Sequence, residues 1–126
     1  MKRKQKITDF KIIYSEERGL FGYTFKLSNI KPFIKGELKI AELIQNCDKK
    51  YNKNCNLMGS CLDYETNYVF LSTKNLISNE TLKLFFSSIF KLDPTADIDD
   101  TELNSIMKEV NSKKEQFLEL DLLQGI

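Results

Sequence analysis

Hydrophobic and polar positions alternate in some segments of the chain and recur at helical spacing in others. Residues 23–27 alternate aromatic or aliphatic with polar side chains, which predicts a half-buried strand. Residues 7–14 alternate partially, which allows one further strand near the N-terminus. Residues 57–73 predict a hairpin, because two runs rich in strand formers flank the turn residues 65–67.

Two segments predict amphipathic helices, because their apolar residues recur at positions i, i+3, i+4 and i+7. The first spans residues 37–47 and follows a predicted loop over residues 28–36. The second begins at a cap formed by Ser78 or Asn79. Pro94 ends it, because proline lacks an amide donor and disfavours a helical conformation in the residue before it.

The last part of the chain admits two interpretations. Helix propensity favours a helix over Glu102–Val110, whereas Phe117–Leu123 alternates as a strand does. The coarse order is β-α-β-β-α-β-β, with room for one more strand at the N-terminus. This order predicts a single α+β domain, in which two helices pack on one face of a small mixed or antiparallel sheet.

Charge is distributed unevenly, although the net charge is only +1. Residues 1–53 hold 13 Lys/Arg and 6 Asp/Glu, whereas residues 54–126 hold 6 and 12. A basic half can neutralise phosphate, but a gradient on a solvated surface would look the same. We interpret residues 1–21 as a basic arm or leader and residues 22–126 as the folded domain.

The residue types exclude most catalytic and metal chemistry. The chain has no histidine, and its three cysteines show no Cys-x-x-Cys spacing, which removes the common zinc sites and the cysteine–histidine nucleophiles. Acidic residues within 93–102 do not match a calcium loop, so we interpret them as a solvated loop. Phe85, Phe86 and Phe90 could stack on bases, but their helical spacing favours a core. We therefore expect no enzyme, cofactor or metal.

No apolar run approaches the roughly 20 residues that cross a bilayer, and no signal peptide follows the basic start. We therefore expect an intracellular protein without membrane contact.

Six segments of the chain carry a family resemblance through their order and spacing. They are Tyr23–Asn29, Ile40–Gln45, Lys49–Gly59, Leu62–Thr73, Ser78–Leu92 and Val110–Leu120.

The order and spacing of these segments resemble the eukaryotic large-subunit ribosomal protein number twenty-two family, which is distinct from the bacterial protein of that number. The resemblance covers residues 22–123 and describes a divergent member. It implies a strand over residues 101–112. It also implies a structural constituent of the cytosolic ribosome, nucleolar during assembly, which contacts ribosomal RNA and neighbouring ribosomal proteins and takes no small-molecule substrate.

That family binds RNA mainly through a strongly basic second helix, whereas this chain has uncharged or acidic residues at Asn79, Glu80, Ser87 and Ser88. The expected contacts therefore move toward the N-terminal arm and the loop after the first helix. Such phosphate contacts depend little on sequence and weaken with salt. The residues expected to bind RNA are Lys2, Arg3, Lys4, Lys6, Lys49, Lys50, Lys53, Lys83 and Lys91.

A second hypothesis makes the chain a small protein-binding inhibitor or adaptor, of a phage- or toxin-related kind. Its interaction surface would be the acidic patch of residues 93–102, which would imitate or compete with nucleic acid.

Overall fold

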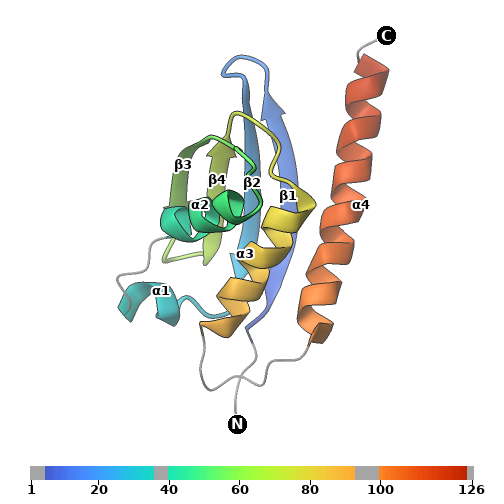
Figure 1. The fold of residues 1–126 in the computed structure, drawn as a ribbon. Helices are drawn as coiled ribbons and strands as arrows, with labels where there is room; N and C mark the ends of the chain where they lie inside the picture. Colours follow the sequence, from blue (N-terminus) through green and yellow to red (C-terminus); the bar gives the residue numbers. More distant parts are fainter. Residues whose placement is uncertain (1–4, 36–39, 93–99, 125–126) are drawn as a thin grey trace.

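The chain forms a four-stranded antiparallel sheet with helices on one side, in a computed structural model that describes residues 5–35, 40–92 and 100–124 (Figure 1). The strands lie in the order β1-β2-β4-β3. In chain order the elements are β1 (Ile7–Ser15), β2 (Leu20–Leu27), α1 (Lys31–Lys35), α2 (Ile40–Lys50), β3 (Leu57–Leu62), β4 (Tyr68–Thr73), α3 (Asn79–Lys91) and α4 (Asp100–Gln124).

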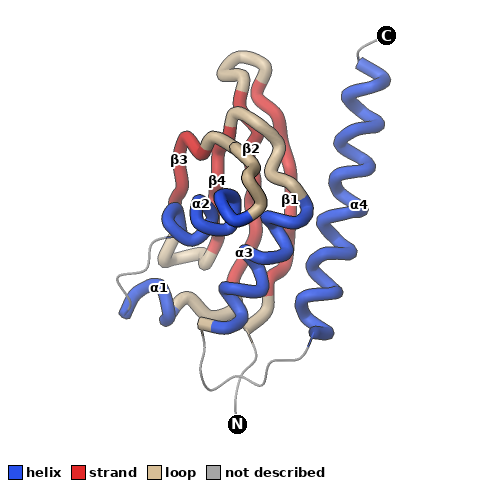
Figure 2. The backbone as a smooth tube through the Cα atoms, viewed as in Figure 1, coloured by secondary structure: helices blue, strands red, loops and turns tan. Residues whose placement is uncertain are grey.

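The helices cover one face of the sheet. α2 and α3 cross that face side by side, and α4 runs along β1 at one edge (Figure 2). α2 packs on α3 and β3, while α4 packs on β1 and α3. Over the described residues, the opposite face carries no helix. None of the described helices is long and apolar enough to cross a membrane.

The core forms where aromatic residues of the sheet meet those of α3. Alternation along β2 turns Tyr23 and Phe25 toward the helices, where both are fully buried. Phe25 packs edge-on against Phe85 and Phe86, with ring centroids 6.0 and 5.3 Å apart. The predicted core stripe of α3 is thus confirmed, with Phe90 half-buried beside it.

Local hydrogen bonds set the ends of the hairpin and of α3. Ser78 caps α3, since its Oγ accepts a hydrogen bond from the Thr81 amide at 3.2 Å. In the turn, the Asp63 carboxylate accepts from the Glu65 amide at 2.9 Å. Asn67 completes this turn in the left-handed region, at φ 64°.

Most of the predicted architecture is confirmed. The chain is a single small α+β domain, with the predicted hairpin and a helix capped by Ser78. The first predicted helix is shifted and spans Ile40–Lys50, while residues 36–39 lie outside the described ranges. α1 occupies part of a segment predicted to be a loop. β1 is the additional N-terminal strand, so residues 7–15 belong to the sheet and not to a basic arm.

The two closing strands are wrong. Residues 100–124 form α4, so neither the strand implied for residues 101–112 nor the one predicted at Phe117–Leu123 exists. Helical spacing of apolar residues lets one side of α4 pack against β1 and α3, and tertiary packing of this kind overrides the short alternation. The residues at this spacing are Leu103, Ile106, Met107 and Val110, of which Ile106 and Val110 are buried.

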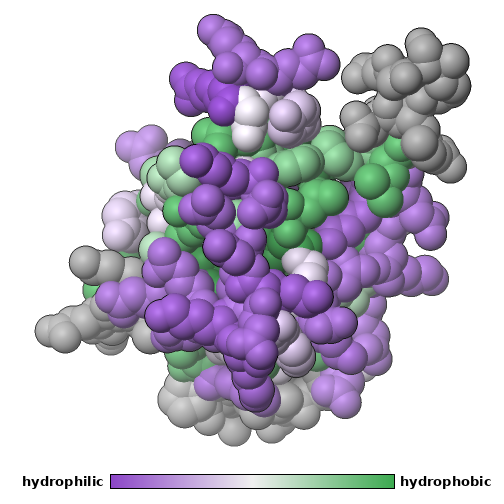
Figure 3. Space-filling view, turned by 45° about the horizontal axis from the view of Figure 1, so that its top comes forward, coloured by the Kyte–Doolittle hydropathy of each residue, from purple (hydrophilic) through white to green (hydrophobic). Residues whose placement is uncertain are grey.

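Polar contacts and an aromatic contact anchor the rest of α4. Glu109 accepts a hydrogen bond from the Phe10 amide at 3.1 Å. Lys114 donates to the Ile77 carbonyl at 2.6 Å, and burial lowers the pKa of Lys114. Phe117 contacts Phe21 with ring centroids 5.9 Å apart. Figure 3 shows a strip of exposed hydrophobic residues below the β1–β2 turn, and this strip extends toward α4. Most of the rest of this side is hydrophilic.

The docking of α4 predicts the effect of shortening one buried side chain. Ile106→Ala should lower the free energy of unfolding by about 2–5 kcal/mol, because it removes buried methyl groups and leaves a cavity. Asn104→Ala, on the exposed side of the same helix, should change it by less than about 0.5 kcal/mol. Urea unfolding monitored by circular dichroism measures both. Equal effects would mean that α4 does not dock.

Candidate nucleic-acid interface

The face of the sheet opposite the helices is the candidate site, and we call it the open face. In β4, Val69, Leu71 and Thr73 are buried on the helix side, so Tyr68, Phe70 and Ser72 point the other way. Strand register then identifies their neighbours on the same face. These neighbours are Thr8, Lys11 and Ile13 of β1, Gly22, Thr24 and Lys26 of β2, and Gly59 and Cys61 of β3.

Two aromatic side chains lie next to each other on the open face. Tyr68 and Phe70 are two positions apart on a central strand, with ring centroids 6.4 Å apart and planes inclined by 35°. Phe70 remains 44% exposed. Large aromatic side chains in the middle of a sheet face are usually buried, whereas nothing within the described structure covers this ring.

Asp9 holds the Tyr68 ring in place. The Tyr68 hydroxyl donates a hydrogen bond to the Asp9 carboxylate at 2.9 Å, which spans the intervening strand β2. Asp9 can reach because β1 is irregular there and Asp9 itself adopts a positive φ of 57°. The hydrogen bond and the charge of Asp9 both stabilise the neutral phenol, so the pKa of Tyr68 is raised.

Gly22 keeps the neighbouring part of the open face flat. A Cβ atom at this position would lie 2.8 Å from Cγ1 of Ile13, which is closer than two carbon atoms pack. The Ile13 side chain therefore lies across β2, yet it stays 61% exposed. Ile13 and the two aromatic rings together give this face an apolar centre.

Lysines flank the apolar centre. Lys26 is paired directly with Tyr68, and Lys11 lies in the same row as Phe70, with Thr24 between them. Lys6 continues β1, because its carbonyl accepts a hydrogen bond from the Ser28 amide at 3.0 Å. All three lysines are exposed. The open face therefore combines stacking surfaces with positive charge.

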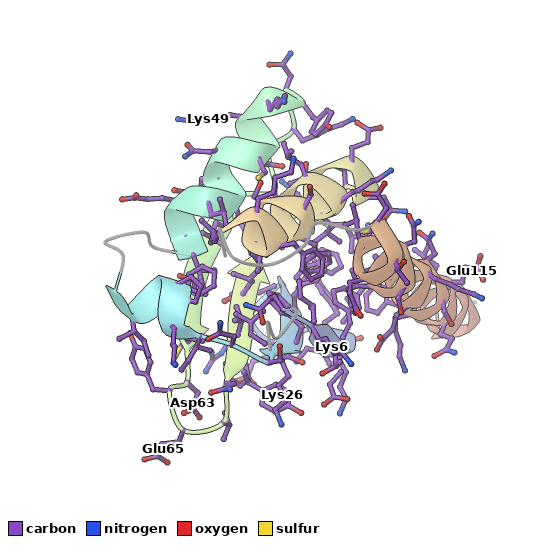
Figure 4. All side chains as sticks on the ribbon, turned by 90° about the horizontal axis from the view of Figure 1, so that it is seen from below. Lys6, Lys26, Lys49, Asp63, Glu65 and Glu115 are labelled. Carbon is purple, nitrogen blue, oxygen red and sulfur yellow. The ribbon has the colours of Figure 1, made fainter. Side chains whose placement is uncertain are left out.

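The lysines expected to bind RNA do not form one patch. Lys6 lies near Lys26 by the sheet, whereas Lys49 lies at the far end of α2 (Figure 4). The others in the described part are on the helix side or in the loop after α2. Lys2, Arg3 and Lys4 lie outside the described residues. The expected set therefore divides between the open face, with Lys6, and a helix-side group of Lys49, Lys50, Lys53, Lys83 and Lys91.

The aromatic pair was not predicted from the sequence, although a signal was present. Tyr68 and Phe70 alternate with Val69 and Leu71, so β4 is apolar on both faces. One of those faces needs a cover or a ligand when only one layer of helices exists. The aromatic residues of α3, which were the candidates for stacking on bases, instead belong to the core or pack against it.

The cysteines and acidic residues offer no metal site in the described part of the chain, where no group of three or more His, Cys, Asp or Glu comes together. Cys47 and Cys55 are buried, and Cys61 is exposed on the open face. Burial and nearby Asp48 raise the pKa of Cys55 to about 12, so its thiol stays protonated. Of the acidic patch, residues 93–99 lie outside the described ranges, and Asp100 and Glu102 begin α4.

Comparison with known proteins gives no relative: no family profile, curated protein or solved structure matches the chain. The geometry of the open face is therefore the main guide to function.

Removing Asp9 tests the hydrogen bond that orients Tyr68. Asp9→Gly tolerates the positive φ and deletes both the acceptor and its charge, so the pKa of Tyr68 should fall toward its ordinary value. NMR titration of ring-labelled tyrosine measures this shift. Tyr23, whose pKa burial raises to about 12, serves as an internal control and should not move. An unchanged Tyr68 titration would contradict the contact.

Proposed function

We propose that the protein binds RNA on the open face of its sheet. One observation carries the proposal: two adjacent aromatic rings, the half-buried Tyr68 and the exposed Phe70, lie on the open face of a central strand and are flanked by lysines. Unpaired bases stack on aromatic side chains of this kind, and their phosphates are neutralised by nearby lysines. A duplex offers no free base faces, so the preferred ligand is a single-stranded segment or a loop.

The arrangement accounts for how each group would act. Tyr68 is held by Asp9 before any ligand arrives, which lowers the entropy lost on binding. The Phe70 ring has no hydrogen-bonding group and would therefore stack on any base. Lys6, Lys11 and Lys26 lie on or beside β1 and β2. An RNA segment that crosses the sheet from β4 toward β1 would therefore stack its bases first and then place its phosphates near the lysines.

The narrower proposal is that this RNA is ribosomal and that the protein is a structural constituent of the large subunit. Its support is the resemblance in segment order, from the strand at Tyr23 through the helix that ends near Leu92. The C-terminal part gives no support, because α4 replaces the implied strands. Ribosomal location in the cytoplasm, nucleolar assembly and contacts with neighbouring ribosomal proteins all depend on this narrower proposal.

Substitutions on the open face should weaken RNA binding in two distinguishable ways. Phe70→Thr removes a stacking ring and keeps a β-branched residue, so affinity for a single-stranded oligonucleotide should fall roughly 5- to 150-fold, as expected for about 1–3 kcal/mol per stacked base. Lys26→Gln should lower the slope of log affinity against log salt by about 0.7, the value for one phosphate contact. Fluorescence anisotropy measures both effects.

Matched controls separate the open face from the helix-side lysines. Tyr51→Thr removes an exposed ring from the loop after α2, and Lys49→Gln removes a charge from that helix. Both should bind RNA as the wild type does. Loss of binding in the controls but not in Phe70→Thr would show that RNA binds on the helix side.

If no RNA binds, the open-face proposal fails and a protein-binding adaptor is favoured. Cosedimentation with large subunits, lost in Phe70→Thr, distinguishes the ribosomal proposal from RNA binding in general.

A further inference from the structure

The two edges of the sheet differ in whether other parts of the protein cover or hydrogen-bond the outward N–H and C=O groups of the edge strand. At the β1 edge, α4 packs alongside and Glu109 accepts the hydrogen bond of the Phe10 amide. β1 also carries the irregularity at Asp9, which interrupts regular pairing. At the β3 edge, no described strand pairs with the side facing away from β4.

The register of β3 against β4 shifts between Leu57 and Gly59, at the start of the strand, but the rest of β3 lacks the charged and proline residues that normally prevent pairing between edges. Its six residues, Leu57–Leu62, include no charged residue and no proline. Folded proteins usually protect an exposed edge with lysine, proline or a covering element. Met58 is 52% exposed and Cys61 is exposed, so the side chains also leave this strand accessible.

The hydrogen-bond pattern identifies which backbone groups are free. The Asp63 amide donates to the Tyr68 carbonyl at 2.9 Å, so this pair is of the hydrogen-bonded kind. Antiparallel pairs alternate, and therefore Ser60 and Leu62, opposite Leu71 and Val69, direct their amide and carbonyl groups away from β4. These groups form a row of donors and acceptors on either side of Cys61.

Charges at the two ends of β3 are complementary in one orientation only. Lys53 precedes the strand, whereas Asp63 and Glu65 follow it and lie together at the turn (Figure 4). An antiparallel partner with the same sequence would place its Lys53 beside the acidic turn of the first copy. A parallel partner would place like charges together. The edge is therefore self-complementary about a two-fold axis.

We infer that two copies of this chain pair through β3, antiparallel and centred on Cys61, so that Ser60 of each copy lies opposite Leu62 of the other and the two sheets form one continuous eight-stranded sheet. Backbone hydrogen bonds of Ser60 and Leu62 join the copies, and Lys53 of each copy faces Glu65 of its partner. The open faces of the two copies become one surface with two aromatic pairs. The pairing does not depend on RNA, so it stands or falls separately from the proposed function.

Sedimentation velocity of the full chain without RNA tests the inference. At high micromolar concentration the wild type should sediment with twice the chain mass of 14.7 kDa. Ser60→Pro removes an edge donor that β4 does not use, so this variant should be monomeric with an unchanged circular dichroism spectrum. A wild type that stays monomeric, or a Ser60→Pro variant that stays dimeric while folded, would overturn the inference.

A charge exchange separates loss of pairing from loss of folding. Lys53→Glu and Glu65→Lys should each shift the wild-type dimer toward monomer, because each places like charges together. The double variant should recover the dimer. Lys108→Glu and Glu115→Lys reverse charges on α4, which packs at the opposite edge, and should leave the dimer unchanged. Figure 4 shows Glu115 on this helix. Single variants that dimerise normally, or a double variant that fails to recover, would contradict the pairing.

Cys61 provides an independent readout. With the strands paired about Cys61, the two Cys61 residues would lie opposite each other and within about 10 Å, a span that a short bis-maleimide covers. Cys47 and Cys55 are buried and should not react. Crosslinked dimer should form in the wild type and be lost in Cys61→Ser. Crosslinking that persists in Cys61→Ser would place the contact elsewhere and count against the β3 edge.

Discussion

The packing of α3 against the aromatic side of the sheet is the interaction on which the rest of the structure depends. Phe25 meets Phe85 and Phe86, and Phe10 meets Phe86 at 6.2 Å between ring centroids. A strand turns successive side chains to opposite faces, so burying one set toward the helices exposes the other set. Since the described helices lie on one side only, Phe70 is exposed and Tyr68 is half-buried on the other side as a direct result of how the core is built.

The same one-sided packing explains the difference between the sheet edges. α4 docks along β1 through Ile106 and Val110, and this position lets Glu109 satisfy a backbone donor of the edge strand. β3 at the other edge packs against α2, but no strand or helix within residues 5–35, 40–92 and 100–124 pairs with its outward backbone groups. One edge is therefore closed by the protein's own C-terminal helix, and the other is left available for pairing.

Local signals in the sequence were enough to predict the elements whose stability is local. The hairpin around Asp63–Asn67 and the cap at Ser78 involve hydrogen bonds between residues close in sequence, and both are confirmed. The secondary structure of residues 100–124 could not be predicted in this way, because Phe117–Leu123 alternates while the segment before it has helical spacing. Contacts with β1, about a hundred residues away in sequence, decide between the two.

The candidate site was predicted less well, for a related reason. Charge asymmetry along the chain says which half is basic but not which face carries the charge, and Lys6 and Lys49 lie on different sides of the molecule (Figure 4). The open face appears only when strand register brings Lys26 beside Tyr68. Its aromatic residues look like core residues in the sequence, because both faces of β4 are apolar.

Amide chemical-shift mapping during titration with a short single-stranded RNA tests the central claim most directly. The account predicts that the largest shifts fall on β4 and β2 around Tyr68, Phe70 and Lys26, with little change along α2 and the loop after it. Shifts concentrated at Lys49–Lys53 and on α3, with the open face unaffected, would contradict it.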